Sequence, residues 1–287
     1  MPKVFRVGVM CAVAFSATSN ARAEPPAVQT APPPLAVSPT LKNTSVGFLA
    51  LETAGAVAVL AGYSIGMGDP PATCSWCEPT GFDTWVRNGL VASHPKTAGL
   101  VSHAFSLGVV PVGALTGLIV SGISEGHGET GWQDAWIMFN TFVLTTGITD
   151  GTKKVVSRER PGFYYGREAL TEAADRPNER NLSFFSGDTA WAFSMAASGS
   201  TLAFLHGYRI APWIAAGTGV AATTAGVLRI TGDMHWATDV LTGAAVGTGI
   251  GIAVPLLLHG RKSSEATTFM IAPLLGDTRG AMVVGAF

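Results

Sequence analysis

The chain has 287 residues, of which 47% are hydrophobic and only 13% are charged, and its formal net charge is -1. This composition is too apolar for an ordinary soluble enzyme and favours one compact helical unit in a membrane. A net charge near zero gives no overall field that would attract nucleic acid, and no run of Lys and Arg interleaved with aromatic residues is present. We therefore do not expect nucleic acid as a partner.

The first 23 residues have the organisation of a secretory signal peptide. Lys3 and Arg6 precede an apolar run from Val7 to Phe15, and small residues follow up to Ala23. A basic, an apolar and a small-residue region in this order are typical of exported proteins. We therefore expect residues 1–23 to direct export. A retained anchor is the alternative, although the apolar run is short for a membrane-spanning helix.

Composition divides the rest of the chain into three parts. Residues 24–43 are rich in proline and have no helical periodicity, which predicts an extended linker. Residues 44–260 are expected to form one helical domain, and residues 261–287 a tail. Two apolar runs in the tail, on either side of Gly276 and Asp277, indicate a short C-terminal hairpin, which is too small to form a membrane barrel.

Long apolar stretches dominate the helical domain, and each is close to the roughly 20 residues that cross a bilayer. They predict an all-α fold, a helical bundle of about six long apolar helices embedded in a membrane. The stretches are residues 45–66, 99–123, 135–149, 189–205, 210–228 and 240–258. Two of them are short and several contain Ser, Thr and Gly, so a helical bundle in the periplasm is the alternative.

The sequence gives conflicting indications of membrane topology. If the signal peptide is cleaved and all six stretches cross the membrane, the loops after the third and fifth crossings are cytoplasmic. Arg261 and Lys262, just after the last stretch, instead favour a cytoplasmic C-terminus and therefore periplasmic loops at those positions. We expect a cell-envelope protein, either in the inner membrane with a site that faces the periplasm or in the periplasm itself.

Two ionisable residues, Glu52 and His103, lie within the apolar stretches. Such a residue at membrane depth is a functional candidate. Both lie near the ends of their stretches, which favours an interfacial position or a hydrogen bond between helices over catalysis.

Cys74 and Cys77 lie in the loop between the first two stretches, whereas Cys11 would leave with the signal peptide. In an exported protein the simplest interpretation of this pair is a local disulfide. A zinc site would need a second pair of ligands, and a thioredoxin-like centre would need a βαβ context that the sequence lacks.

A histidine and an aspartate four residues apart, His235 and Asp239, lie at the start of the last apolar stretch, and Arg229 precedes them. On a helix that starts near His235, the imidazole and the carboxylate would share one face. The carboxylate could then accept the Nδ1 proton and leave Nε2 as a nucleophile or base. The alternative is a core histidine beside a capping aspartate.

The longest loop between stretches, residues 150–188, is rich in basic residues, although its acidic residues nearly balance them and a solvated surface is the alternative. Lys153 precedes Arg160 by seven residues, and Ser186-Gly187 directly precedes a new apolar helix, whose first N–H groups can bind an anion. With Arg229, these groups could bind a tetrahedral oxyanion. The seven basic residues of the loop are Lys153, Lys154, Arg158, Arg160, Arg167, Arg176 and Arg180.

Three segments in this order resemble the signatures of one known family. They are KKVVSRERP at Lys153–Pro161, FSGD at Phe185–Asp188 and LRITGDMHWATD at Leu228–Asp239. The chain resembles the type 2 phosphatidic acid phosphatase superfamily, which includes lipid phosphatases, bacterial acid phosphatases and vanadium haloperoxidases. The resemblance covers about residues 135–258 and implies the helical fold of that family.

The resemblance also implies a mechanism and the roles of individual residues. His235 would be the nucleophile that forms a phosphohistidine, and Asp239 would orient it. The substrate would be a lipid phosphate or pyrophosphate, and no metal or other cofactor would be needed, because positioning and charge neutralisation carry most of phosphoryl transfer. The residues that would bind the phosphate are Lys153, Arg160, Ser186, Gly187 and Arg229.

The sequence departs from the family pattern at three positions. Phe185 replaces a proline and Leu228 replaces a serine, and we expect both changes to be tolerated. Asp188 stands where the family has the histidine that protonates the leaving oxygen. An aspartate among cations should be ionised at neutral pH and therefore a poor proton donor. The alternative is a weakened catalytic acid, because a bound phosphate dianion would raise the pKa of Asp188 again. Asp188 would also be a good N-cap for a helix starting at Thr189.

Three functions are consistent with these motifs. The first is a phosphatase of phosphoric monoesters or diphosphates, with activity reduced by Asp188. The second is a pseudoenzyme that binds a phosphorylated lipid without turnover. The third is a vanadate-dependent haloperoxidase, which is disfavoured because the chain lacks the usual size of such enzymes.

Overall fold

The computed structural model describes residues 69–259 except Asp175, two strands near the C-terminus, and single helical residues between positions 47 and 61. The expected signal peptide and linker lie outside the described residues, as do Glu52, Arg261 and Lys262. What the sequence indicates for them stays a prediction.

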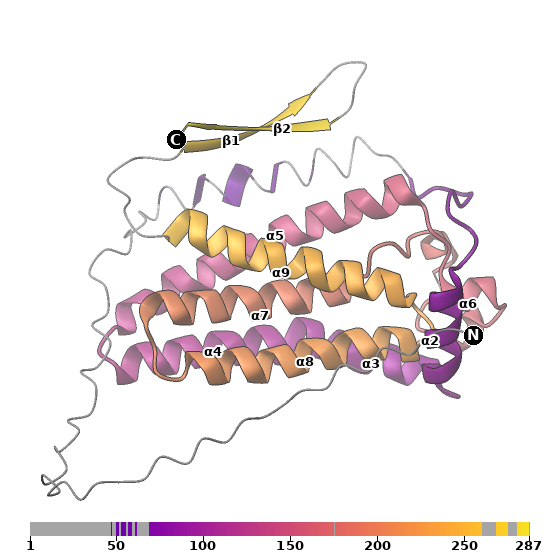
Figure 1. Cartoon of the computed structure of the whole chain (residues 1–287), viewed down its shortest axis with the longest axis horizontal. Helices are drawn as coiled ribbons and strands as arrows, with labels where there is room; N and C mark the ends of the chain where they lie inside the picture. Colours follow the sequence, from indigo (N-terminus) through magenta and orange to yellow (C-terminus); the bar gives the residue numbers. More distant parts are fainter. Residues whose placement is uncertain are drawn as a thin grey trace, which may run out of the picture. The chain divides into compact units, whose positions relative to one another are not determined.

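The described part of residues 69–259 is helical, which confirms the all-α prediction (Figure 1). Five of the six predicted apolar stretches form long helices, and the first lies largely outside the described residues. In chain order the elements are α2 Gly81–Leu90, α3 Pro95–Ala104, η1 Phe105–Val109, α4 Val110–Ser124, η2 Gly128–Thr130, α5 Gly131–Val156, α6 Pro161–Tyr164, η3 Glu168–Leu170, η4 Pro177–Glu179, α7 Gly187–His206, α8 Ala211–Thr231 and α9 Ala237–His259.

The ends of the helices follow local signals in the sequence. Pro95 begins α3, and the π-helical turn η1 joins α3 to α4, so that residues 95–124 run as one long helix. At the end of α5, Ser157 adopts a left-handed conformation with φ of 47° and donates its N–H to Lys153 O at 2.9 Å. Helix α5 therefore ends at Val156, and Lys153 lies in its last turn.

Helix α7 lies at the centre of the bundle and packs against α4, α5, α8 and α9. Its contact with α9 depends on glycines at every fourth residue of α9. A Cβ atom added at Gly243, Gly247 or Gly251 would lie 2.7, 2.3 or 2.4 Å from a backbone carbonyl oxygen of residues 186–194. Because real Cβ atoms do not approach so closely, the two backbones can pack at this distance only with glycine at these positions.

Among the residues described, three helices are long and apolar enough to cross a membrane: Pro95–Ser124, Ala211–Thr231 and Ala237–Leu258. They expose large apolar side chains, including Val112, Trp213 and Leu257. Such surfaces suit contact with lipid. Helices α5 and α7, which the sequence also predicted as apolar stretches, do not meet the same criteria of length and composition.

The predicted C-terminal hairpin is present. Strands β1 (Thr268–Leu274) and β2 (Gly280–Ala286) pair antiparallel, with Thr268 opposite Ala286 and Leu274 opposite Gly280.

Five helix ends meet at one end of the bundle. They are the start of α3, the end of α5, the start of α7, the end of α8 and the start of α9, and the segment between α5 and α7 closes this end (Figure 1). Residues far apart in the sequence are thereby brought to a common region.

Candidate active site

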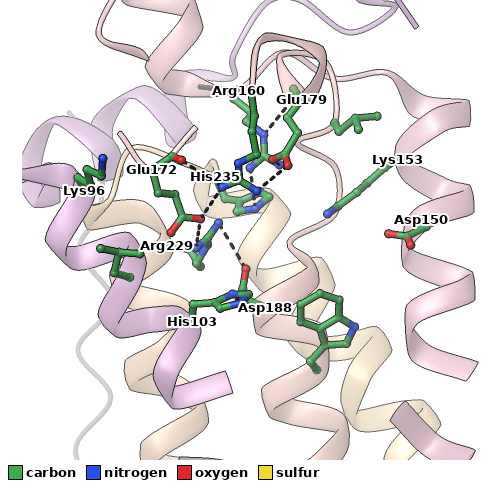
Figure 2. A pocket seen from close by; sticks show the side chains of 14 residues that line it. Lys96, His103, Asp150, Lys153, Arg160, Glu172, Glu179, Asp188, Arg229 and His235 are labelled. Carbon is green, nitrogen blue, oxygen red and sulfur yellow. Dashed lines mark hydrogen bonds and ion pairs between the residues drawn. The ribbon is translucent and has the colours of Figure 1, made fainter. Parts of the chain in front are cut away.

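A cavity of about 480 Å³ opens at this end of the bundle (Figure 2). Its lining includes one or more residues from each of the three motifs, which the sequence predicted would act together: Lys153, Arg160, Asp188, Arg229 and His235. Six further ionisable residues line it: Lys96, His103, Asp150, Glu172, Arg176 and Glu179. Five of the eight predicted site residues therefore line the cavity, whereas Ser186, Gly187 and Asp239 do not, and the motifs did not predict the six additional residues.

His235 lies in the turn between α8 and α9 and is only 1% exposed. Its Nδ1 lies 2.8 Å from Ser183 O, a carbonyl that can only accept, so Nδ1 carries the proton and Nε2 is an unprotonated acceptor. Arg160 Nη1 lies 3.2 Å from this Nε2. Burial, with the positive charges of Arg160, Arg229 and Lys153, holds the pKa of His235 well below its ordinary value. The imidazole is therefore neutral at pH 7.

Asp239 does not accept the Nδ1 proton of His235, contrary to the sequence prediction. Its Oδ2 lies 3.7 Å from Nδ1, which is too far for a hydrogen bond. The reason is that α9 begins at residue 237, so His235 precedes the helix and the two side chains do not share a helical face. Asp239 instead accepts hydrogen bonds from Ser183 Oγ (2.6 Å), Trp236 N (3.0 Å) and Arg158. Asp239 therefore contacts the side chain of Ser183, the residue whose carbonyl accepts from His235 Nδ1 and which the motifs do not include.

Arg158 is a second residue whose role the sequence analysis missed. It is 1% exposed and pairs with both Asp83 of α2 and Asp239 of α9, while its guanidinium lies 3.8 Å from the centre of the Trp76 ring. Arg158 lies within the first motif, two residues before Arg160. Residues two apart in an extended segment point to the same side, so alternation does not separate the two arginines. The partners of Arg158 are more than 70 positions away in the sequence, and no local pattern could have identified them.

The expected disulfide between Cys74 and Cys77 is present in the structure, with the Cα atoms 5.4 Å apart. The loop that it closes lies against the segment that carries Arg158. Ser75 N donates to Ser157 O at 2.9 Å, and Ser157 Oγ donates to Thr73 O at 2.8 Å. The disulfide loop therefore supports the backbone that positions the first motif.

Arg160 and Arg229 are both almost fully buried in the cavity wall, and each contacts a glutamate of the loop above it (Figure 2). Arg160 Nη2 lies 3.1 Å from Glu179 Oε2, and Arg229 Nη1 lies 2.8 Å from Glu172 Oε1. The buried Nε of Arg229 has no hydrogen-bond partner in the described part of the chain. A buried donor of this kind is costly unless it is satisfied.

Lys153 extends from the last turn of α5 towards the cluster (Figure 2). Burial, reinforced by the charge of Arg160, lowers the pKa of Lys153 to about 8. A Cβ atom at Gly187 would lie 3.2 Å from Lys153 Nζ, so the absence of a side chain at Gly187 leaves room for the ammonium group. Ser186 is the N-cap residue of α7, and the N–H groups of the first turn that follows it lack intrahelical acceptors.

Asp188 is not the N-cap that the sequence predicted, because α7 begins at Gly187 rather than at Thr189. Its Oδ1 lies 2.7 Å from His103 Nδ1 and accepts from Ser106 Oγ at 3.1 Å, and its Oδ2 lies 3.4 Å from Arg229 Nη2. Burial alone would raise the pKa of Asp188, but these cationic neighbours hold it well below its usual range. The carboxylate is therefore ionised, as the sequence analysis expected.

His103 makes the interhelical hydrogen bond that its position in the sequence predicted, and it also lines the cavity. The other two departures from the family pattern, Phe185 and Leu228, do not line it. Among the residues described, no three His, Cys, Asp or Glu side chains are grouped so that they could hold a metal ion.

The fold and the cavity define the class of the protein, a helical bundle of membrane type with a cationic cavity at one end. The family model described as PAP2 superfamily matches residues 134–263. These residues include all three motifs. Over this region the chain is therefore similar to the PAP2 superfamily, which confirms the predicted resemblance to type 2 phosphatidic acid phosphatases.

One similar protein of known activity is the Lipid A 1-phosphatase of Porphyromonas gingivalis. It is 42% identical to this chain over 69 residues. The alignment covers 24% of this chain and only 15% of that protein. The similarity is therefore local and does not extend to the whole of either chain.

Proposed function

We propose that this chain is a phosphatase that hydrolyses a lipid phosphate or pyrophosphate through a phosphohistidine on His235. The observation that carries the proposal is a neutral, buried histidine whose Nε2 lies 3.2 Å from Arg160 in a cavity with two further cations, Lys153 and Arg229. A neutral imidazole has the lone pair that a nucleophile needs. The surrounding cations favour a bound phosphate.

In the proposed reaction, Nε2 of His235 attacks phosphorus while the bond between phosphorus and the leaving oxygen breaks. Arg160, Arg229 and Lys153 neutralise the charge on the other phosphate oxygens, and the carbonyl of Ser183 stabilises the positive charge on the imidazole through Nδ1–H. A water molecule then attacks the phosphohistidine, which releases inorganic phosphate and restores His235. The protein groups supply all charges that this chemistry requires, so the mechanism uses no metal.

The proposed substrate is a lipid because the cavity opens at the ends of helices that are apolar enough to cross a membrane. Phosphate groups of lipids lie at that level, beside the hydrocarbon core. The local similarity to a lipid A 1-phosphatase supports the same substrate class. We further propose that the site faces the periplasm, as the basic residues after the last predicted span suggest.

Turnover of purified protein in detergent micelles tests the proposal. An aryl phosphate and a short-chain lipid phosphate should both release inorganic phosphate, and His235→Ala should abolish this release. His94→Ala is a matched control, because His94 precedes α3, is exposed and does not line the cavity. Equal rates for the wild type and His235→Ala would contradict the proposal.

A non-catalytic phospholipid-binding protein is the second candidate, and the ionised Asp188 favours it. An ionised carboxylate cannot protonate a leaving oxygen, which an alkyl phosphate needs. This candidate predicts that the wild type binds a lipid phosphate, with Arg229→Ala weakening the binding, but shows no turnover that depends on His235.

A further inference from the structure

The proposed function leaves the leaving oxygen without a proton donor, because Asp188 is ionised. The cavity contains a second histidine, however, on a helix outside all three motifs. We infer that His103 is the general acid of this site and that Asp188 is the residue that positions it. This inference rests on the proposed phosphatase function.

The position of His103 is fixed at one edge of its ring. Its Nδ1 lies 2.7 Å from Asp188 Oδ1, and Asp188 is itself held by Ser106 Oγ at 3.1 Å and Arg229 Nη2 at 3.4 Å. The two ring nitrogens lie on different edges, so Nε2 is directed away from Asp188. The His103 side chain is 50% exposed and lines the cavity, whereas that of Asp188 is 9% exposed. The exposed edge of the ring is therefore the one that a substrate can reach.

The charges around the two histidines of the cavity have opposite signs. His235 faces Arg160, Arg229 and Lys153, which keep it neutral. His103 contacts the ionised Asp188, and an imidazole paired with a carboxylate is stabilised in its protonated form. Environments of opposite charge move the pKa values of two groups apart, so that one can serve as the acid and the other as the nucleophile or base.

The charged groups that face His103 come from each element that packs around it. Asp188 belongs to α7, Arg229 to α8, and Glu172 to the loop that follows η3. Lys153 of α5 lines the same cavity, and its charge acts on Asp188. The positive charge of Arg229 opposes protonation of His103, whereas Asp188, Glu172 and a bound phosphate favour it.

Arg229 acts on both histidines, because its Nη2 lies 3.4 Å from Asp188 Oδ2 and its charge lowers the pKa of His235. In Figure 2, Arg229 is located between His235 and the pair formed by His103 and Asp188. A phosphate bound to Arg229 therefore has the nucleophile on one side and His103 on the other. In-line displacement requires this order, because the leaving oxygen departs opposite the attacking nitrogen.

The proton transfers balance over the two steps of the reaction. As the bond between phosphorus and the leaving oxygen breaks, that oxygen takes the Nε2 proton of His103 and leaves as an alcohol. His103 is then neutral and accepts a proton from the water that attacks the phosphohistidine. The enzyme returns to its starting state with His103 protonated and His235 neutral.

The dependence on the leaving group tests this role. His103→Gln should lower kcat for a short-chain alkyl lipid phosphate by about 10²- to 10⁴-fold, the usual value of general acid catalysis. The same variant should change kcat for an aryl phosphate by less than about tenfold, because an aryl oxide leaves without a proton. His94→Gln, outside the cavity, should change neither rate.

The variant Asp188→Asn tests the positioning role by a different measurement. Loss of the carboxylate removes the partner of the protonated imidazole, so the alkaline limb of kcat for the alkyl substrate should move to lower pH. The kcat for the aryl substrate should keep its pH profile. If Asp188 had only a structural role, Asp188→Asn would lower kcat for both substrates without shifting the pH dependence of either.

Three results would overturn the inference, and they are distinguishable. Equal losses on alkyl and aryl substrates in His103→Gln, with retained vanadate binding and helical circular dichroism, would overturn the role of His103 and leave the proposed function intact. The same equal losses with impaired vanadate binding would assign His103 to phosphate binding or folding and would also overturn the inference. If the wild type lacks any turnover that depends on His235, the proposed function fails first, and the inference fails with it.

Discussion

Lys153 gives the cavity a predicted pH dependence. Its pKa is about 8, so its ammonium group loses charge as the pH rises through this value. Phosphate binding should weaken in the same range, and kcat/KM for an aryl phosphate, which needs no general acid, should fall above about pH 8. Lys153→Arg should move this fall to higher pH, because arginine stays charged.

The neighbouring Lys154→Arg is the matched control for this measurement, because Lys154 does not line the cavity. Its pH profile should equal that of the wild type. If kcat/KM of Lys153→Arg falls at the same pH as that of the wild type, deprotonation of another group causes the fall.

Glu172 competes with substrate for Arg229. Its carboxylate lies 2.8 Å from the guanidinium that we expect to bind phosphate. Glu172→Gln should therefore bind vanadate about tenfold more tightly, a change equivalent to about 1.4 kcal/mol. Isothermal titration of the wild type and the variant at constant ionic strength measures this difference.

Glu168→Gln is the matched control, since Glu168 belongs to the same loop but does not line the cavity. It should leave the affinity for vanadate unchanged. Weaker binding by Glu172→Gln would mean that Glu172 holds Arg229 in place instead of competing for it.

The residues of the three motifs could be predicted from the sequence, but their pairing could not. The interpretation of His235 and Asp239 as neighbours on one helical face was wrong because it depended on where α9 begins, a boundary that periodicity places only to within a few residues. The contact between His103 and Asp188 joins residues 85 positions apart. Only the packing of the continuous helix α3–η1–α4 against α7 and α8 brings them together, and no local pattern in the sequence records that packing.

At the scale of the elements, the glycines of α9 set how closely it packs against α7. A Cβ at Gly247 would lie 2.3 Å from Ala190 O, so Gly247→Ala should force the helices apart and cost about 1–3 kcal/mol of stability, the usual range for overpacking. Activity should also fall, because the start of α7 carries Asp188 and the turn before α9 carries His235. Thermal unfolding in detergent and turnover together measure the two effects.

Gly249→Ala is the control on the same helix, since a Cβ there would meet nothing within 4 Å. It should be neutral or slightly stabilising, because alanine is the better helix former. Equal stability of the two variants would contradict the close packing of α7 and α9.

The helices themselves were well predicted, because long apolar stretches bounded by Pro, Gly and charged residues are strong signals. The ends of the helices were predicted less accurately. The predicted start of α7 was two residues too late, and this changed the interpretation of Asp188. The sequence placed this residue at the N-cap, whereas Ser186 holds that position. As part of the first turn of α7, the Asp188 side chain contacts α3 and α8 instead of capping its own helix.

At the scale of the whole molecule, the location of the cavity is the feature that connects the fold to a lipid substrate. Three described helices are apolar enough to span a membrane, and the cationic residues gather at one end of the bundle. Composition alone predicted the membrane-type bundle. It could not predict which end carries the site, because that depends on the direction of each helix and on contacts between distant residues.

Trapping of the phosphoenzyme tests the central proposal most directly. The wild type should be mixed with a lipid phosphate labelled with ³²P, quenched within milliseconds to seconds in alkali, and digested for mass spectrometry. We predict label on His235 that is stable in alkali, labile in acid and absent from His235→Ala. Turnover by the wild type without label on His235 would contradict the proposed mechanism, as would equal labelling of His235→Ala.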